Sequence, residues 1–129
     1  MIEGRVLCVK SDLVVALLIK QALKNFEVTI VQSIKEAELL LTERSFDLIL
    51  ASSHLPDGSG LDFCRSMREK SDRTPFLIIA GGMALKEADV ENAGAQGLIH
   101  KGFRFVQELE GKVLAISNSS NQSKASSSS

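Results

Sequence analysis

Short apolar runs alternate with longer segments of helical periodicity along most of this chain. Five runs of three to five residues are too short for helices and are mostly rich in β-branched residues, which predicts strands over residues 6–9, 28–31, 48–51, 76–80 and 97–99. Between or after these runs, apolar residues recur with 3.6-residue spacing in three sets: Val15, Leu18, Ile19 and Ala22; Ile34, Ala37 and Leu41; and Val106, Leu109, Val113 and Ile116. The pattern predicts amphipathic helices packed on a sheet.

The alternation of strands and helices also predicts how the sheet is connected. Ser33 and Glu36 form a capping-box pattern, which places the start of the second helix at this point. Strands separated by helices pair in parallel through right-handed crossovers, so we expect an α/β, doubly wound sheet with helices on both faces. The functional crevice of such a sheet lies beyond the carboxyl ends of its strands, here residues 10–12, 52–54, 80–82 and 100–102.

Composition narrows the class of protein. The 129 residues are 44% apolar and 24% charged, which predicts one domain with a single core. The net charge of −1 argues against direct binding of nucleic acid. No apolar run approaches the roughly 18 residues of a membrane span and no signal peptide is evident, so we expect a cytoplasmic protein.

Cys8 and Cys64 fit neither a metal site nor a disulfide framework and are predicted to be buried free thiols.

Both ends of the chain differ from its middle. Residues 1–4 are interpreted as a natural start or as the remnant of an engineered protease site, since residues 2–5 read Ile-Glu-Gly-Arg. Residues 118–129 are rich in Ser and predict a flexible linker or tail, too polar to repay the entropy of ordering. The folded domain is therefore expected over residues 5–117.

Several motifs of the middle segment follow one another in a familiar order. They are LPDGSGLDFC at residues 55–64, Thr74-Pro75 before the fourth strand, Gly94-Ala95 before the fifth, and Lys101 at its end. Together they resemble the response-regulator receiver domain family over about residues 5–117. The resemblance implies a flavodoxin-like (βα)5 fold with strand order 2-1-3-4-5. It also implies phosphoryl transfer by an aspartate nucleophile, a Mg²⁺-binding acidic pair, a hydroxyl and a lysine, each answering the charge on the transferring group.

Most of those roles are vacant in this chain. The resemblance assigns a vestigial phosphoacceptor crevice to Lys10, Ser11, Asp12, Ser52, Ala80 and Lys101. Ser52 stands where the family has its acceptor aspartate, Lys10 and Ser11 replace the acidic pair, and Ala80 replaces the hydroxyl residue. Lys101 alone keeps its family identity. Asp12 lies one place beyond the acidic pair.

Two further positions depart from the family pattern. Leu98 takes the place of the aromatic residue that changes rotamer on activation. Gly102 takes the place of a proline that often follows a cis peptide bond, which changes the expected backbone geometry there. We therefore expect one dominant conformation rather than a phosphorylation-driven switch.

The charges of the crevice predict that it binds no metal and needs no cofactor. Mg²⁺ takes oxygen ligands, usually carboxylates, whereas this crevice offers Asp12 against the ammonium groups of Lys10 and Lys101. We expect Lys10 to replace the metal, either by pairing with Asp12 or by occupying the cation position. The resulting prediction is a phosphorylation-independent pseudo-receiver that acts as a regulatory, protein-interaction module of a bacterial-type two-component signalling protein and is not an enzyme.

Two other functions remain open from the sequence. The crevice between Lys10 and Lys101 is compatible with a site that senses a small molecule or anion. A Ser52–Lys101 nucleophilic dyad would make the protein a hydrolase or phosphotransferase, although a hydrogen-bonded relic of the acceptor pocket is the preferred interpretation. His54 and His100 are interpreted as ordinary loop and strand-end histidines.

Two surfaces are candidates for partner contacts. Val14 and Leu17 lie off the core stripe of the first helix and are expected to face solvent or a partner. On the fourth helix, Lys86, Glu87, Asp89 and Glu91 form a charged, mostly acidic segment on the face by which receivers usually meet partners. The expected partners are proteins or an output domain tethered through the C-terminal linker. A homodimer remains an alternative, and neither nucleic acid nor membrane is expected.

Overall fold

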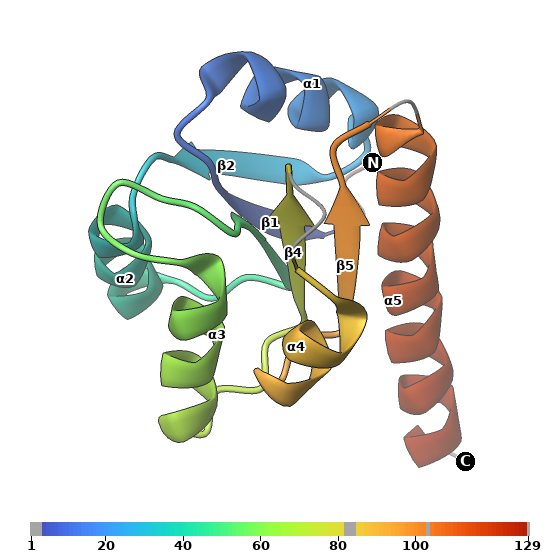
Figure 1. Cartoon of the computed structure of the whole chain (residues 1–129). Coiled ribbons are helices and arrows are strands. Elements are labelled where there is room, and N and C mark those ends of the chain that lie inside the picture. Colours follow the sequence, from blue (N-terminus) through green and yellow to red (C-terminus); the bar gives the residue numbers. More distant parts are fainter. Residues whose placement is uncertain (1–3, 82–84, 103, 129) are drawn as a thin grey trace.

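The computed structural model describes residues 4–81, 85–102 and 104–128, with side chains up to Ile116 in the last range. Five parallel strands form one sheet in the order β2-β1-β3-β4-β5 (Figure 1). The strands are β1 (Arg5–Val9), β2 (Glu27–Val31), β3 (Leu48–Ser52), β4 (Phe76–Ala80) and β5 (Gly97–His100). The predicted fold and strand order are confirmed, and each strand agrees with its predicted limits to within one residue.

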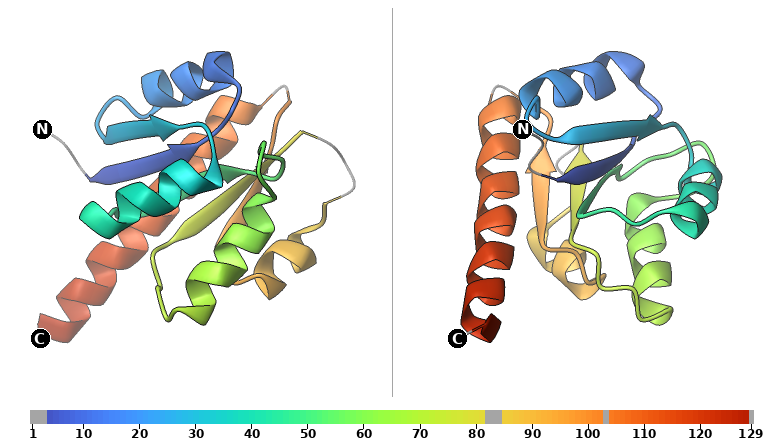
Figure 2. Two further views of the ribbon diagram at one scale, coloured as in Figure 1. Left: turned by 90° about the vertical axis from the view of Figure 1, so that its left-hand side faces the viewer. Right: turned by 180° about the vertical axis from the view of Figure 1, so that it is seen from behind.

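Helices cover both faces of the sheet (Figures 1 and 2). Helices α1 (Leu13–Ala22) and α5 (Phe105–Ser128) pack on one face, where Ile19 and Leu109 are fully buried. Helices α2 (Ile34–Glu43), α3 (Gly60–Glu69) and α4 (Glu87–Asn92) pack on the other. Cys8 and Cys64 are buried free thiols, as predicted, one in each of the two cores.

Side chains along each strand alternate between these two cores. In β1, Val6 and Cys8 belong to the core under α1 and α5, whereas Leu7 and Val9 belong to the core under α2, α3 and α4. This alternation is the ordinary consequence of the two-residue period of a β-strand. Continued one residue beyond the end of β1, the same alternation places Lys10 on the side of the sheet that α1 and α5 cover.

The start of α2 is fixed by a variant of the predicted capping box. Ser33 Oγ accepts a hydrogen bond from the N–H of Glu36 at 3.2 Å, as expected of an N-cap serine. The Glu36 carboxylate accepts from the N–H of Gln32 at 3.1 Å and from the Ser33 hydroxyl at 3.2 Å. The glutamate therefore reaches one residue further back than the pattern predicts.

The core stripe of α1 differs from its prediction at Leu18. Ile19 is fully buried, and Val15 and Ala22 pack against the same core, as predicted. Ala16 is also fully buried, whereas Leu18 is 43% exposed. The prediction for Leu18 was therefore wrong, because this residue lies on the flank of α1 that faces α5 and not beneath the helix. Val14 and Leu17 are 78% and 60% exposed, as expected.

Helix α5 continues further than the sequence predicted. Its backbone is helical to Ser128, through the segment interpreted as a flexible linker from its composition. Adding residues to an existing helix carries no new nucleation cost, so a helix extends into a segment more readily than it would begin there. The role of residues 118–129 as a tether stays a prediction. No helix in the described ranges is long and apolar enough to cross a membrane.

Candidate functional site

The carboxyl ends of β1, β3 and β5 bring three polar side chains together. The backbone N–H of Lys10 donates to the carbonyl of Val31 at 2.9 Å, and that of Lys101 donates to the carbonyl of Ala80 at 2.9 Å. Both lysines are therefore held by sheet hydrogen bonds just beyond the strands. Ser52 is the last residue of β3. Backbone pairing thus fixes the Cα positions from which these side chains reach into the crevice.

Lys10 and Ser52 form a buried polar pair. Lys10 Nζ donates a hydrogen bond to Ser52 Oγ at 3.3 Å, and the two residues are only 4% and 6% exposed. The backbone N–H of His54 donates to the same oxygen, also at 3.3 Å. The Ser52 hydroxyl is thereby held in place by two donors, as a hydrogen-bonded remnant of a pocket would be.

The surroundings of Lys10 disfavour its positive charge. Burial lowers the pKa of Lys10 most, and the nearby ammonium of Lys101 lowers it further, while Asp12 and Cys8 oppose the change. Burial also raises the pKa of the Cys8 thiol, from its ordinary 9.0 to about 12. The crevice therefore places the buried ammonium of Lys10 close to that of Lys101, which is exposed.

The other residues assigned to the crevice have structural roles. The Asp12 carboxylate caps α1 by accepting from the N–H groups of Val14 at 3.0 Å and Val15 at 3.3 Å. The sequence left two alternatives for Lys10, pairing with Asp12 or occupying the cation position. In the structure its ammonium donates to Ser52, while the Asp12 carboxylate caps α1 and favours the charge of Lys10 through space. Ser11 is exposed, and Ala80 is 2% exposed in the core under α2, α3 and α4.

Lys101 bends over the end of the neighbouring strand. A Cβ at Gly81 would lie 3.1 Å from Lys101 Cε and 3.6 Å from its Nζ, so the absence of a side chain at Gly81 gives the lysine room. The described residues contain no cis peptide bond, and Gly102 therefore follows Lys101 through a trans bond. Leu98 is 2% exposed and packs in the core.

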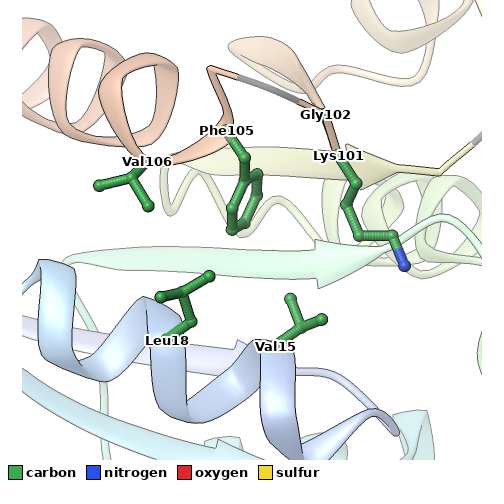
Figure 3. Close-up of a pocket in the computed structure, with 6 residues that line it drawn as sticks. All are labelled: Val15, Leu18, Lys101, Gly102, Phe105 and Val106. Carbon is green, nitrogen blue, oxygen red and sulfur yellow. The ribbon is translucent and has the colours of Figure 1, made fainter.

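A cavity of about 360 Å³ adjoins this crevice between the first turns of α1 and α5 (Figure 3). It is lined by Val15, Leu18, Lys101, Gly102, Phe105 and Val106. The lining is therefore mostly apolar, with a single charged residue. Lys101 belongs both to this cavity and to the crevice.

Comparison with known proteins agrees with the fold. The family model for the response regulator receiver domain matches residues 6–114. The chain belongs to the response-regulator receiver domain family. It is 39% identical over 90 residues to the response regulator protein PilR of Pseudomonas aeruginosa, a match that covers 67% of this chain and 20% of PilR. It is 32% identical over 100 residues to a probable transcriptional regulatory protein of Sinorhizobium fredii, covering 75% of this chain and 43% of the relative.

Solved receiver structures share the fold at low sequence identity. The receiver domain of the Francisella response regulator 1452 superposes with a TM-score of 0.83 at 21% identity, covering 91% of this chain and 98% of that one. The chemotaxis response regulator CheY4 of Vibrio cholerae gives 0.78 at 22% identity, covering 88% and 98%. This receiver spans less than half the length of the curated relatives it matches.

The proposed partner face of the receiver is exposed but partly occupied by local contacts. Glu87, Asp89 and Glu91 are exposed on α4, and Lys86 is its N-cap. Asp89 Oδ2 accepts from the backbone N–H of Lys86 at 3.1 Å, so its carboxylate serves the helix start. Glu87 Oε1 lies 4.0 Å from Nζ of Lys112 on α5, which links the two helices of this face.

The remaining chemical candidates in the receiver are His54, the Ser52–Lys101 dyad and a metal site. His54 is exposed. Ser52 Oγ is hydrogen-bonded to Lys10, whereas the candidate dyad pairs Ser52 with Lys101. Within the described part of the chain, no three His, Cys, Asp or Glu side chains are grouped as a metal site would require.

Sequence reasoning did not identify the cavity of the receiver. Val15 and Leu18 were interpreted as core residues, and Phe105 was not singled out. Strand alternation could have indicated the side of the sheet on which to look. Val6 and Cys8 lie beneath α1 and α5, and Lys10 continues their face of β1.

Proposed function

We propose that this receiver is a pseudo-receiver, independent of phosphorylation, that serves as a protein-interaction module of a longer signalling protein. The observation that carries the proposal is the buried hydrogen bond between Lys10 and Ser52, at the position where the family resemblance places a carboxylate and a metal. An ammonium group there repels Mg²⁺, which needs oxygen ligands. An alcohol is a poor nucleophile unless a base activates it, and the Ser52 hydroxyl accepts a hydrogen bond from the Lys10 ammonium.

The residues of the switch positions support a single resting conformation. A phosphorylation-driven switch works by making different contacts at the acceptor site in two states. Here Ala80 offers no hydroxyl, and Leu98 is packed in the same core, without an aromatic ring to change rotamer. Output then depends on what binds to a fixed surface.

The surface made by α4, β5 and α5 is the proposed docking face. Glu87 and Glu91 are exposed there and can steer a basic partner toward the receiver. The curated relatives are named response regulator and transcriptional regulatory proteins and are longer than this chain. By analogy, we place this receiver in a longer regulatory protein, with residues 118–129 leading to an output domain.

Phosphorylation independence is tested by NMR with Mg²⁺ and a beryllofluoride mimic of the phosphoryl group. At millimolar concentrations, neither Mg²⁺ alone nor Mg²⁺ with beryllofluoride should shift the amide signals of Ser52 and Ala80, because the carboxylates that would hold them are missing. Saturable shifts at these two residues would overturn the proposal.

The docking role is tested in the full-length protein. Reversing the charges in the double variant Glu87→Lys/Glu91→Lys should weaken its biological output, whereas Ser52→Ala should barely change it. Far-UV circular dichroism checks that both variants are folded. The opposite ranking, with Ser52→Ala abolishing output in a folded protein, would assign function to the crevice instead of the docking face.

A further inference from the structure

Among the described residues, neither lysine of the crevice forms an ion pair with a carboxylate, although the charge of Asp12 partly opposes the lowering of the Lys10 pKa. Lys10 is 4% exposed and donates to the neutral hydroxyl of Ser52, while the Asp12 carboxylate caps α1. The segment 82–84 that follows β4 is Gly-Met-Ala and carries no carboxylate side chain. Because burial and Lys101 both lower the pKa of Lys10, an anion bound between the two ammonium groups would relieve an existing electrostatic cost.

The adjoining cavity supplies an apolar compartment on the same side of the sheet. Its volume of about 360 Å³ lies within the usual range for small-molecule sites, roughly 300–1,000 Å³. Strand alternation directs Lys10 toward this side, since Cys8 two residues earlier packs in the core under α1 and α5. The crevice and the cavity therefore lie on the same side of the sheet and share Lys101.

Lys101 connects the two compartments. Figure 3 shows its aliphatic stem beside Phe105 and Val15, with the ammonium group at the end away from Val106 and Leu18. A lysine often covers apolar surface with its stem while its charged end meets a polar group. Here the stem forms one wall of the cavity, and the ammonium marks the boundary with the crevice.

We propose that crevice and cavity together form one binding site for a small amphipathic organic anion. Its carboxylate would lie between the ammonium groups of Lys10 and Lys101, and its apolar tail would lie among Val15, Leu18 and Phe105. The proposal goes beyond the docking function, and it rests on the proposed phosphorylation independence in one respect, that no metal occupies the crevice. Such a ligand would connect the crevice to α1 and α5, and so to the surface on which partners dock.

The test is a titration of the whole chain with hexanoate, followed by NMR and by thermal unfolding at fixed pH and ionic strength. Acetate carries the same head without the tail, and 1-hexanol carries the tail without the charge. Hexanoate should shift the amide signals of Val15, Lys101 and Phe105 saturably. It should bind about tenfold more tightly than acetate, because its four additional methylene groups are partly removed from water. The affinity for hexanoate should exceed the affinity for 1-hexanol by a similar factor.

Two substitutions separate the charged and apolar parts of the site. Lys101→Met keeps an unbranched stem in the wall and removes the ammonium, so hexanoate affinity should fall about tenfold while hexanol affinity stays the same. Leu18→Glu should weaken hexanoate binding by a similar factor, and this side chain is exposed enough for the fold to tolerate the change. The matched controls Lys20→Met and Leu39→Glu, at exposed sites, should leave hexanoate affinity within about twofold.

The inference would be overturned if the parent chain showed no saturable response to hexanoate. It would also be overturned by equal affinities for hexanoate and acetate, by equal affinities for hexanoate and hexanol, or by unchanged hexanoate binding in folded Lys101→Met. The titration contains neither Mg²⁺ nor a phosphoryl mimic, so its failure leaves the docking function standing. Conversely, a response to Mg²⁺ and beryllofluoride would overturn phosphorylation independence without depending on hexanoate.

Discussion

An aspartate at position 52 would test the electrostatics of the crevice directly. Ser52 is 6% exposed, and its hydroxyl already accepts from Lys10 Nζ at 3.3 Å, so the substitution Ser52→Asp brings a carboxylate against one ammonium and near that of Lys101. Two opposite charges about 4 Å apart attract by about 4 kcal/mol at an effective dielectric constant of about 20. Desolvation of the carboxylate offsets part of this attraction.

Comparing Ser52→Asp with Ser52→Asn isolates the effect of the charge. Asparagine has nearly the same shape as aspartate, so the cost of packing the larger side chain is the same in both variants. We expect Ser52→Asp to be more stable than Ser52→Asn by about 2 kcal/mol at pH 7, the size of a hydrogen bond between charged groups. In a domain of this size that corresponds to a difference of about 8 °C in Tm. Thermal and urea unfolding followed by circular dichroism measure both quantities.

The sign of the pH dependence follows from the introduced carboxylate. Lysine neighbours hold its folded-state pKa below the ordinary value of about 3.9, so its stabilisation is present above that value and is lost as the pH falls through the folded-state pKa. In a Lys10→Met background, the difference between the Asp and Asn variants should fall by about half, since Lys101 remains. An Asp variant no more stable than the Asn variant at pH 7 would refute this account, as would a difference that Lys10→Met leaves unchanged.

Two further predictions concern the scaffold of the site. Burial raises the pKa of Cys8 from 9.0 to about 12, so its contribution to stability is complete below pH 9 and is lost as the pH rises toward 12. Urea unfolding should show that this contribution falls by about 1.4 kcal/mol between pH 8 and pH 10, and that Cys8→Ala lacks this loss. A Cβ at Gly60 would collide with the backbone oxygen of Ser52, so Gly60→Ala should destabilise the domain by about 1–3 kcal/mol. Gly102→Ala, with open space around its Cβ, should change stability by less than about 0.5 kcal/mol; equal effects at the two glycines would contradict the packing argument.

Much of the fold could be predicted because it depends on local periodicity. Buried parallel strands read as short apolar runs, and helices read as 3.6-residue stripes, so all five strands were placed to within one residue. The order of the sheet came from the family motifs. Local patterns were less reliable where the packing of neighbouring elements decides whether a residue is buried. Leu18 is an example, because it lies on the flank of α1 that faces α5 and stays partly exposed.

The site depended more strongly on tertiary structure. The sequence determined that the crevice carries lysines and a serine in place of carboxylates, because these identities are read directly at the strand ends. It could not determine that Lys10 donates to Ser52 rather than to Asp12, since the first pair is separated by 42 positions and the second by two. The capping requirement of α1 decided that choice: unpaired N–H groups at a helix start attract the nearest carboxylate, leaving the lysine to the hydroxyl. The cavity beside Lys101 likewise exists only where α1 and α5 meet, because it is made by side chains that are distant along the chain and adjacent only after the helices pack.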